Sequence, residues 1–311
     1  MPSPNEWPTN WPELYRALNL EPHQHALYVV DNDQLPPMDT VVKLPKVFLI
    51  SGEGNTSKFQ HLARPGVWFF DSIVSDQYPN TGAWMFHFDK TIHVNQQLGF
   101  AFTSQPNTHL KFDMLLGLQR PHRDMAWDFV HQHPDLKAQC YVTYYGRDNQ
   151  FVPGYQDQMT PIEIRWSSEC ITIDNVTAGR SQIMPLDVYS QTCYSVVCET
   201  NAEDRHHSFF TEKIAKPMLA GRPFVVLANK YYLRRLRQLG FETFDSVLDE
   251  SYDCESDHVT RWRMALQQVQ WLSQQDSQQI YLQLARQLAH NQNQIQSDWP
   301  AKLVSQIAAL V

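Results

Sequence analysis

The sequence predicts an α/β fold with a parallel sheet, and three features of its central stretch support this prediction. Two short apolar runs, at 194–198 and 224–228, have the length and the β-branched content of buried strands. A helix is predicted between them, with Thr211 as its N-cap and Gly221 just after its end. A second helix is predicted at 231–239. Strands that alternate with helices in this order are typical of a parallel α/β unit.

The rest of the chain supplies the other predicted elements. Residues 150–192 are rich in Pro, Gln and Asp, which indicates a long insertion with little regular structure. Apolar residues repeat with a helical period through the Gln-rich residues 255–293, so the glutamines are expected on a solvated face. Further strands are predicted at 26–31, 47–50, within 61–72, at 84–93, at 112–117 and at 140–145, and further helices at 125–130 and 301–311.

The length of the chain, 311 residues, is enough for two hydrophobic cores. We expect an N-terminal α/β domain at 1–110, a second α/β domain at 111–290 and a C-terminal helix at 291–311. The formal net charge is −8, so the chain has no basic field that would attract a nucleic-acid partner.

The cysteines and the apolar segments indicate the cellular compartment in which the protein is expected. The chain has five cysteines and no Cys-x-x-Cys pair, and reduced core thiols suit a cytoplasmic protein. The first residues lack a basic segment followed by an apolar one, so no signal peptide is predicted. No apolar run reaches the roughly 18 residues that predict a transmembrane segment.

Polar residues gather where the strand at 194–198 ends and the following helix begins. In a parallel sheet, ligands bind at the carboxyl ends of the strands, beside the free N–H groups of helix N-termini. Glu199, Thr211, Glu212 and Lys213 all fall at this edge. Lys213 would add a positive charge for a phosphate, and Glu212 could accept hydrogen bonds from a ribose. The alternative is a plain capped helix with a solvated Glu-Lys pair.

The order of these residues resembles a known motif. Glu199, a short loop and then Phe-Thr-Glu-Lys at 210–213 are similar to the donor-binding motif of α-1,3-fucosyltransferases. In that family a strand ends in Phe-Glu-Asn, and Val-Thr-Glu-Lys opens a helix after a loop; Thr200 stands here in place of the Asn. Residues 240–253 are also similar to a group of uncharacterised glycosyltransferase-like proteins that share the Thr-Glu-Lys helix.

The resemblance implies a fold and an activity. The fold is the GT-B architecture, with two Rossmann-like domains and here a C-terminal helical segment. The activity is an inverting transfer of a sugar from a nucleotide-sugar donor, GDP-fucose in that family, to a glycan or another hydroxyl acceptor. The motif implies that Thr211 opens the donor site, that Glu212 binds the ribose, that Lys213 binds the diphosphate and that Glu199 faces the donor sugar. Golgi members carry a membrane anchor, so its absence here indicates a bacterial type of enzyme.

The resemblance also names a candidate catalytic base. The strand at 47–50 leads into Gly52-Glu53-Gly54-Asn55, which is similar to the strand and Gly-Glu-Asn pattern of bacterial α-1,3-fucosyltransferases. The Glu of that pattern is the proposed base that deprotonates the acceptor hydroxyl, and Glu53 occupies its position here. The alternative is that Glu53 is a turn residue in a Gly-rich loop.

Two arginines are candidates for holding the diphosphate, because a guanidinium matches phosphate oxygens. Arg123 lies where Pro121 indicates the start of a helix after a strand, and Arg147 follows the strand predicted at 140–145. For Arg147 the alternative is a residue without a role in binding. The histidines and cysteines have no metal-ligand spacing, so we expect neither a required metal nor another cofactor.

The resemblance therefore predicts a glycosyltransferase, and the sequence leaves two alternatives open. One is a nucleotide- or carbohydrate-binding protein that keeps the fold without catalysis. The other is a GT-B enzyme that uses a UDP- or CMP-linked sugar.

Overall fold

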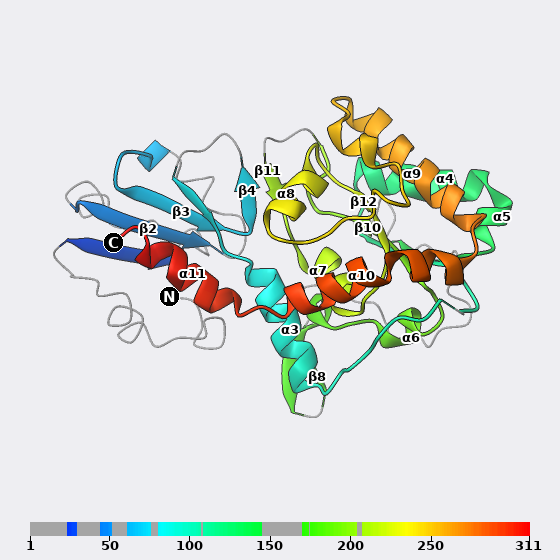
Figure 1. Cartoon of the computed structure of the whole chain (residues 1–311), viewed down its shortest axis with the longest axis horizontal. Coiled ribbons are helices and arrows are strands. Elements are labelled where there is room, and N and C mark those ends of the chain that lie inside the picture. Colours follow the sequence, from blue (N-terminus) through cyan, green and yellow to red (C-terminus); the bar gives the residue numbers. More distant parts are fainter. Residues whose placement is uncertain are drawn as a thin grey trace. The chain divides into compact units, whose positions relative to one another are not determined.

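The structure is a computed structural model that describes residues 24–29, 44–51, 61–75, 80–106, 108–144, 170–173, 175–203 and 207–311. These residues belong to two compact units, which are described separately (Figure 1). The first unit contains the described residues of Met1–Asp89 together with Ser297–Val311, and the second contains those of Lys90–Gln296. Both units contain a parallel β-sheet, so the predicted α/β class is confirmed.

The sheet of the first unit has the strand order β1-β2-β3-β5, and all its neighbouring pairs are parallel. Buried apolar residues on β1, β2 and β3, among them Ala26, Leu49 and Phe69, form its core. Helix α11 closes the β5 edge, where the Gln306 side chain bonds both to the amide and to the carbonyl of Ala83. The strands are β1 (His25–Val29), β2 (Lys46–Ser51), β3 (Val67–Asp71) and β5 (Thr81–Ala83), and the helix is α11 (Trp299–Ala308).

The sheet of the second unit has the strand order β12-β10-β6-β7, again with parallel neighbours. Its four strands are almost fully buried, as expected for a parallel sheet with both faces covered. The strands are β6 (Phe112–Gly117), β7 (Cys140–Tyr144), β10 (Tyr194–Cys198) and β12 (Phe224–Leu227).

Two crossovers leave the middle of this sheet in opposite directions. Strand β6 leads through α4 (Pro121–Gln132) to β7 at one edge, and β10 leads through α7 (Glu212–Leu219) to β12 at the other. Right-handed crossovers in opposite directions place their helices on opposite faces. Accordingly α4 packs with α9 (His258–Ser273), and α7 packs with α10 (Ser277–Ile295) (Figure 1). Strands β6 and β10 therefore flank the point where the strand order reverses, which is where ligands bind in such sheets.

The predicted strand-helix-strand-helix unit around residue 211 is confirmed. Thr211 is the N-cap of α7, and its hydroxyl oxygen accepts a hydrogen bond from the Lys213 amide. Gly221 follows the helix with a φ of +61°, the left-handed conformation that favours glycine at this position. The remaining elements are β4 (Ile73–Ser75), α3 (Phe86–Gln97), α5 (Pro134–Lys137), β8 (Cys170–Ile173), β9 (Val176–Gly179), η3 (Arg180–Gln182), α6 (Leu186–Tyr189), β11 (His207–Phe209), α8 (Tyr232–Gln238) and η4 (Glu250–Cys254).

The strand predicted at 84–93 is wrong, because these residues belong mostly to α3. The buried positions Phe88, Thr91, Ile92 and Asn95 have helical spacing. Two of the four are polar, which hides this period in the sequence. The two polar residues are Thr91 and Asn95, and Gln182 satisfies both. The Thr91 hydroxyl donates to the side-chain oxygen of Gln182, and the Asn95 amide donates to its backbone carbonyl.

The prediction of little regular structure at 150–192 is also wrong for the part that the structure describes. Residues 170–173 and 175–192 contain the hairpin of β8 and β9, the turn η3 and the helix α6. The predicted helical region at 255–293 is confirmed as α9 and α10, with a break between them.

The glutamines of α10 do more than contact solvent. Gln292 donates a hydrogen bond to the carbonyl of Leu219 at 3.1 Å, and Gln294 donates one to the carbonyl of Leu239 at 2.8 Å. These carbonyls lie at the C-terminal ends of α7 and α8, where helix carbonyls lack partners within the helix. The expected solvated face is therefore only part of their role. No helix in the described part of the chain combines the length and apolar character needed to cross a bilayer.

Candidate functional site

A cavity of about 310 Å³ lies in the second unit at the reversal of strand order. Its floor is formed by β6, from Asp113 to Gly117, and by β10, from Ser195 to Cys198. Residues of α7 and the turn η3 form another side. The cavity reaches the carboxyl ends of both strands, so its position agrees with the site expected for a parallel sheet.

The first turn of α7 brings Lys213 to this cavity. Its ammonium group lies 2.9 Å from Glu212 Oε1, 3.3 Å from Thr200 Oγ1 and 3.4 Å from Thr211 Oγ1. The Lys213 side chain keeps 26% of its surface exposed, and that of Glu212 keeps 10%. These contacts hold a positive charge beside the amino end of a helix, where an anionic ligand is favoured.

Glu199 lies behind this turn and is fully buried. Its two carboxylate oxygens accept hydrogen bonds from the hydroxyl groups of Thr211, at 2.6 Å, and Tyr232, at 2.7 Å. Burial raises the pKa of Glu199, and the nearby Lys213 opposes this effect. Since Thr211 in turn bonds the Lys213 amide, Glu199 holds the N-cap residue of α7 in place. Direct contact between Glu199 and a donor sugar stays a prediction.

Arg123 joins the ends of the two central strands. Its guanidinium donates hydrogen bonds to the carbonyl of Leu118, at 2.7 Å, and to that of Cys198, at 3.2 Å. Its buried Nε has no hydrogen-bond partner among the described residues, and the side chain lines the cavity. Gly117, at the end of β6, has a φ of +66°, the left-handed conformation that favours glycine. Burial lowers the pKa of Arg123.

His122, the neighbour of Arg123, is buried behind the cavity. Its Nε2 lies 2.8 Å from the backbone carbonyl of Glu199, and its ring packs against Trp262. Burial, together with the positive charge of Arg123, lowers the pKa of His122 to about 3. The ring is therefore neutral at physiological pH, and its Nε2–H donates to the carbonyl of Glu199, the residue that follows β10.

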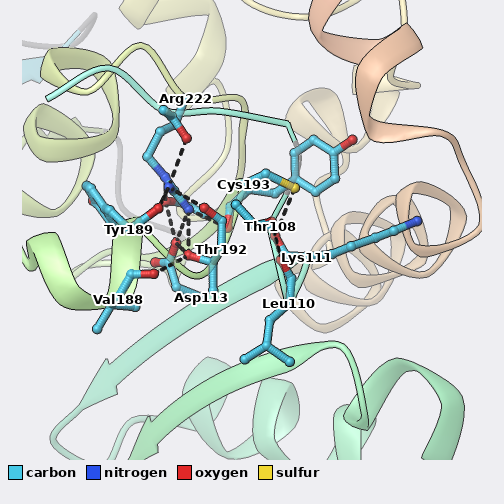
Figure 2. Close-up of polar contacts among 12 residues, drawn as sticks. Thr108, Leu110, Lys111, Asp113, Val188, Tyr189, Thr192, Cys193 and Arg222 are labelled. Carbon is cyan, nitrogen blue, oxygen red and sulfur yellow. Dashed lines mark hydrogen bonds and ion pairs between the residues drawn. The ribbon is translucent and has the colours of Figure 1, made fainter. Parts of the chain in front are cut away.

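At the inner end of the cavity, the lining residue Asp113 forms a buried ion pair with Arg222, which lies outside the lining (Figure 2). Arg222 Nη2 lies 2.7 Å from Asp113 Oδ2, and the hydroxyl of Ser195 donates to the same oxygen at 2.8 Å. The guanidinium also donates to the carbonyl of Thr192 at 2.8 Å and lies over the ring of Tyr189. Burial raises the pKa of Asp113, and Arg222 offsets part of that rise.

Four basic residues line the cavity: Arg120, Arg123, Lys213 and Lys216. Two acidic residues accompany them, Glu212 and the Asp113 that Arg222 already neutralises. The basic side chains outnumber the acidic ones, so the cavity has a positive potential. Such a potential favours a ligand with negative charge.

The predicted site residues are distributed as follows. Arg123, Glu212 and Lys213 line the cavity, whereas Glu199 and Thr211 lie behind it. Glu199 accepts a hydrogen bond from Thr211, and Thr211 accepts one from the Lys213 amide. Glu53 and Arg147 lie outside the described residues.

The sequence analysis missed the contribution of Lys216. The spacing in the sequence could have identified it, since Lys216 follows Lys213 by three residues and therefore lies on the same helix face. The Asp113–Arg222 pair had no such signal, because its two members are far apart in the sequence.

No group of three or more His, Cys, Asp and Glu side chains within the described ranges is arranged to hold a metal ion. Comparison with known proteins found no family model, no curated protein and no solved structure that matches the chain.

Proposed function

We propose that the chain is a glycosyltransferase that binds the diphosphate of a nucleotide-sugar donor in the cavity at the ends of β6 and β10. One observation carries the proposal: a cavity at the reversal of strand order is lined by Arg123, by Lys213 and by the start of a capped helix. Transfer from such a donor releases a nucleoside diphosphate, whose growing negative charge must be stabilised. Guanidinium and ammonium groups supply this stabilisation without a metal ion.

The proposal extends to the rest of the reaction. The enzyme is of the inverting GT-B type, with GDP-fucose as the donor that the resemblance favours and a glycan or another hydroxyl compound as acceptor. Glu53 deprotonates the acceptor hydroxyl, and Arg147 assists Arg123 at the diphosphate. Glu212 binds the ribose of the donor. The reaction takes place in the cytoplasm, which suits the free thiols of Cys140, Cys193, Cys198 and Cys254.

Replacement of Lys213 by alanine is expected to weaken nucleotide binding about tenfold or more, the loss typical of a hydrogen bond to a charged group. The measurement is thermal shift of the purified protein with GDP, UDP, CMP and TDP. At saturating ligand, one of the nucleotides should raise the melting temperature of the wild type, because binding stabilises the folded state. The rise should be smaller in Lys213→Ala at the same concentration.

Lys230→Ala is the matched control. In the wild type the Lys230 ammonium donates a hydrogen bond to Ser256, and Lys230 does not line the cavity. The control should keep the full nucleotide-dependent rise. If no nucleotide changes the melting temperature, or if both variants respond as the wild type does, the cavity does not bind a nucleotide through Lys213.

Replacement of Glu53 by glutamine separates catalysis from binding. A general base contributes about a hundredfold or more to the rate, so Glu53→Gln should lose sugar transfer to that extent while it keeps its affinity for the donor. Release of nucleoside diphosphate from the preferred nucleotide sugar is the measurement. A wild type that binds the donor and shows no turnover with any acceptor would instead indicate the non-catalytic binding protein.

A further inference from the structure

Three basic side chains of the cavity, Arg120, Arg123 and Lys216, have no carboxylate partner among the described residues. Arg120 is exposed to solvent, and Arg123 bonds backbone carbonyls at the ends of β6 and β10. Lys216 differs from both, because it lies on α7, three residues after Lys213, and the sequence motif assigns it no role. It is therefore the basic residue that needs an explanation.

Lys216 is partly buried, and its described contacts leave hydrogen-bonding capacity unused. Its ammonium donates a single hydrogen bond, of 2.8 Å, to the backbone carbonyl of Ser181 in η3. An ammonium group carries three N–H donors, so two have no partner among the described residues. Both Lys216 and Ser181 line the cavity. The free donors are thus in position for a ligand.

The carboxylates that act on the charge of Lys216, namely Glu212, Asp113 and Glu199, already have other partners. Burial lowers the pKa of Lys216, and the nearby Glu212 carboxylate offsets part of this effect. That carboxylate already forms an ion pair with Lys213 at 2.9 Å. At the inner end, Asp113 is paired with Arg222. An anion bound between Lys213 and Lys216 would therefore add negative charge that Lys216 does not share with Arg222 or with the hydroxyl groups around Glu199.

The spacing of the two lysines suits a particular anion. Residues three apart on a helix have Cβ atoms about 5 to 6 Å from each other, so two ammonium groups can contact adjacent parts of one ligand. The two phosphates of a diphosphate share a bridging oxygen and present such adjacent anionic parts. A single phosphate offers fewer acceptor oxygens and less negative charge to these donors than two linked phosphates do.

We propose that Lys216 is a second anion-binding residue of the cavity, through which the site selects two linked phosphates over one. Lys213 and Arg123 bind one phosphate at the mouth, and Lys216 binds the other one helical turn further in. This inference rests on the proposed function, in which the diphosphate belongs to the nucleotide-sugar donor, and it names the residue that recognises the second phosphate.

Calorimetric titration with inorganic pyrophosphate and orthophosphate tests the inference. The wild type should bind pyrophosphate at least about tenfold more tightly than orthophosphate, the gain expected from one further charge-assisted hydrogen bond. Lys216→Gln should lose most of this preference, whereas Lys216→Arg should keep it because the charge is retained. Lys230→Gln, which changes a lysine outside the cavity, should bind as the wild type does.

A wild type that binds both anions equally, or a folded Lys216→Gln that keeps the preference, would overturn the inference. Lys216→Gln also loses the bond to Ser181, so a measurement on the wild type guards against misfolding. Saturating pyrophosphate should protect Lys216 from an amine-directed acetylating reagent, as read by mass spectrometry, and orthophosphate should protect it less. Equal labelling of Lys216 with and without pyrophosphate would equally overturn the inference.

These probes separate the inference from the proposed function. Pyrophosphate selectivity that depends on Lys216, without turnover of any nucleotide sugar, would support the inference and contradict the function. Turnover of a nucleotide sugar that is insensitive to Lys216→Gln would support the function and overturn the inference.

Discussion

Replacing Arg222 by methionine is expected to lower the free energy of unfolding of the second unit by about 3 to 5 kcal/mol, the usual loss when one partner of a buried ion pair is removed. The Arg222 side chain has no exposed surface, and that of Asp113 has 5%. Without the guanidinium, the Asp113 carboxylate would be buried without a counter-ion. The carbonyls of Thr192 and Tyr194 would also lose donors. Chemical denaturation followed by circular dichroism measures the change.

The control for this variant is Arg286→Met. Arg286 also forms an ion pair, with Glu242 at 2.7 Å, but its side chain is 75% exposed. Exposed pairs contribute about 0 to 1 kcal/mol, so this variant should be close to the wild type.

A double variant identifies the cause of the loss. If the unpaired Asp113 carboxylate is responsible, Arg222→Met combined with Asp113→Asn should be less destabilised than the two single losses added together. Strict additivity, or an Arg222→Met protein as stable as the wild type, would contradict the assignment of Arg222 and Asp113 as a stabilising pair.

The protein is expected to lose about 2.5 kcal/mol of stability between pH 7 and pH 4.5 through His122 alone. In the unfolded chain a histidine takes up a proton below its ordinary pKa of 6.5, whereas in the folded chain the pKa of His122 is lowered to about 3. The unfolded state therefore binds the additional proton throughout this window. The contribution of His122 is complete above pH 6.5 and falls as the pH approaches 3.

The variant His122→Gln isolates this contribution. Glutamine keeps an N–H donor for the Glu199 carbonyl, which lies 2.8 Å from His122 Nε2, and it does not titrate. As the pH is lowered from 6.5 to 4.5, the free energy of unfolding of the variant should fall less steeply than that of the wild type. The difference in slope should correspond to about one bound proton. Equal slopes for variant and wild type would show that His122 is protonated similarly in both states.

The fold was predictable where local chemistry and pattern agree. Strand β10, the N-cap at Thr211 and the glycine after α7 each have a local cause, and the sequence analysis found all three. Helix α3 was missed because its buried face contains Thr91 and Asn95, whose burial depends on Gln182 at a distant position. Hydrogen bonds between distant residues leave no period in the sequence.

The candidate site was predictable to a similar extent. The edge of the sheet and the basic residues Arg123 and Lys213 followed from the strand-helix order. The sequence placed Glu199 at the same edge, but the structure surrounds its carboxylate with Thr211 and Tyr232. The direction of a side chain at a strand end depends on the helices packed around it, and Tyr232 belongs to a later helix.

A crystal structure of the protein with a bound nucleoside diphosphate is the most direct test of the central claim. The account predicts that the diphosphate lies at the ends of β6 and β10, within hydrogen-bond distance of Arg123 and Lys213, with its second phosphate toward Lys216. A nucleotide bound away from this cavity, at concentrations that saturate the protein in solution, would contradict it.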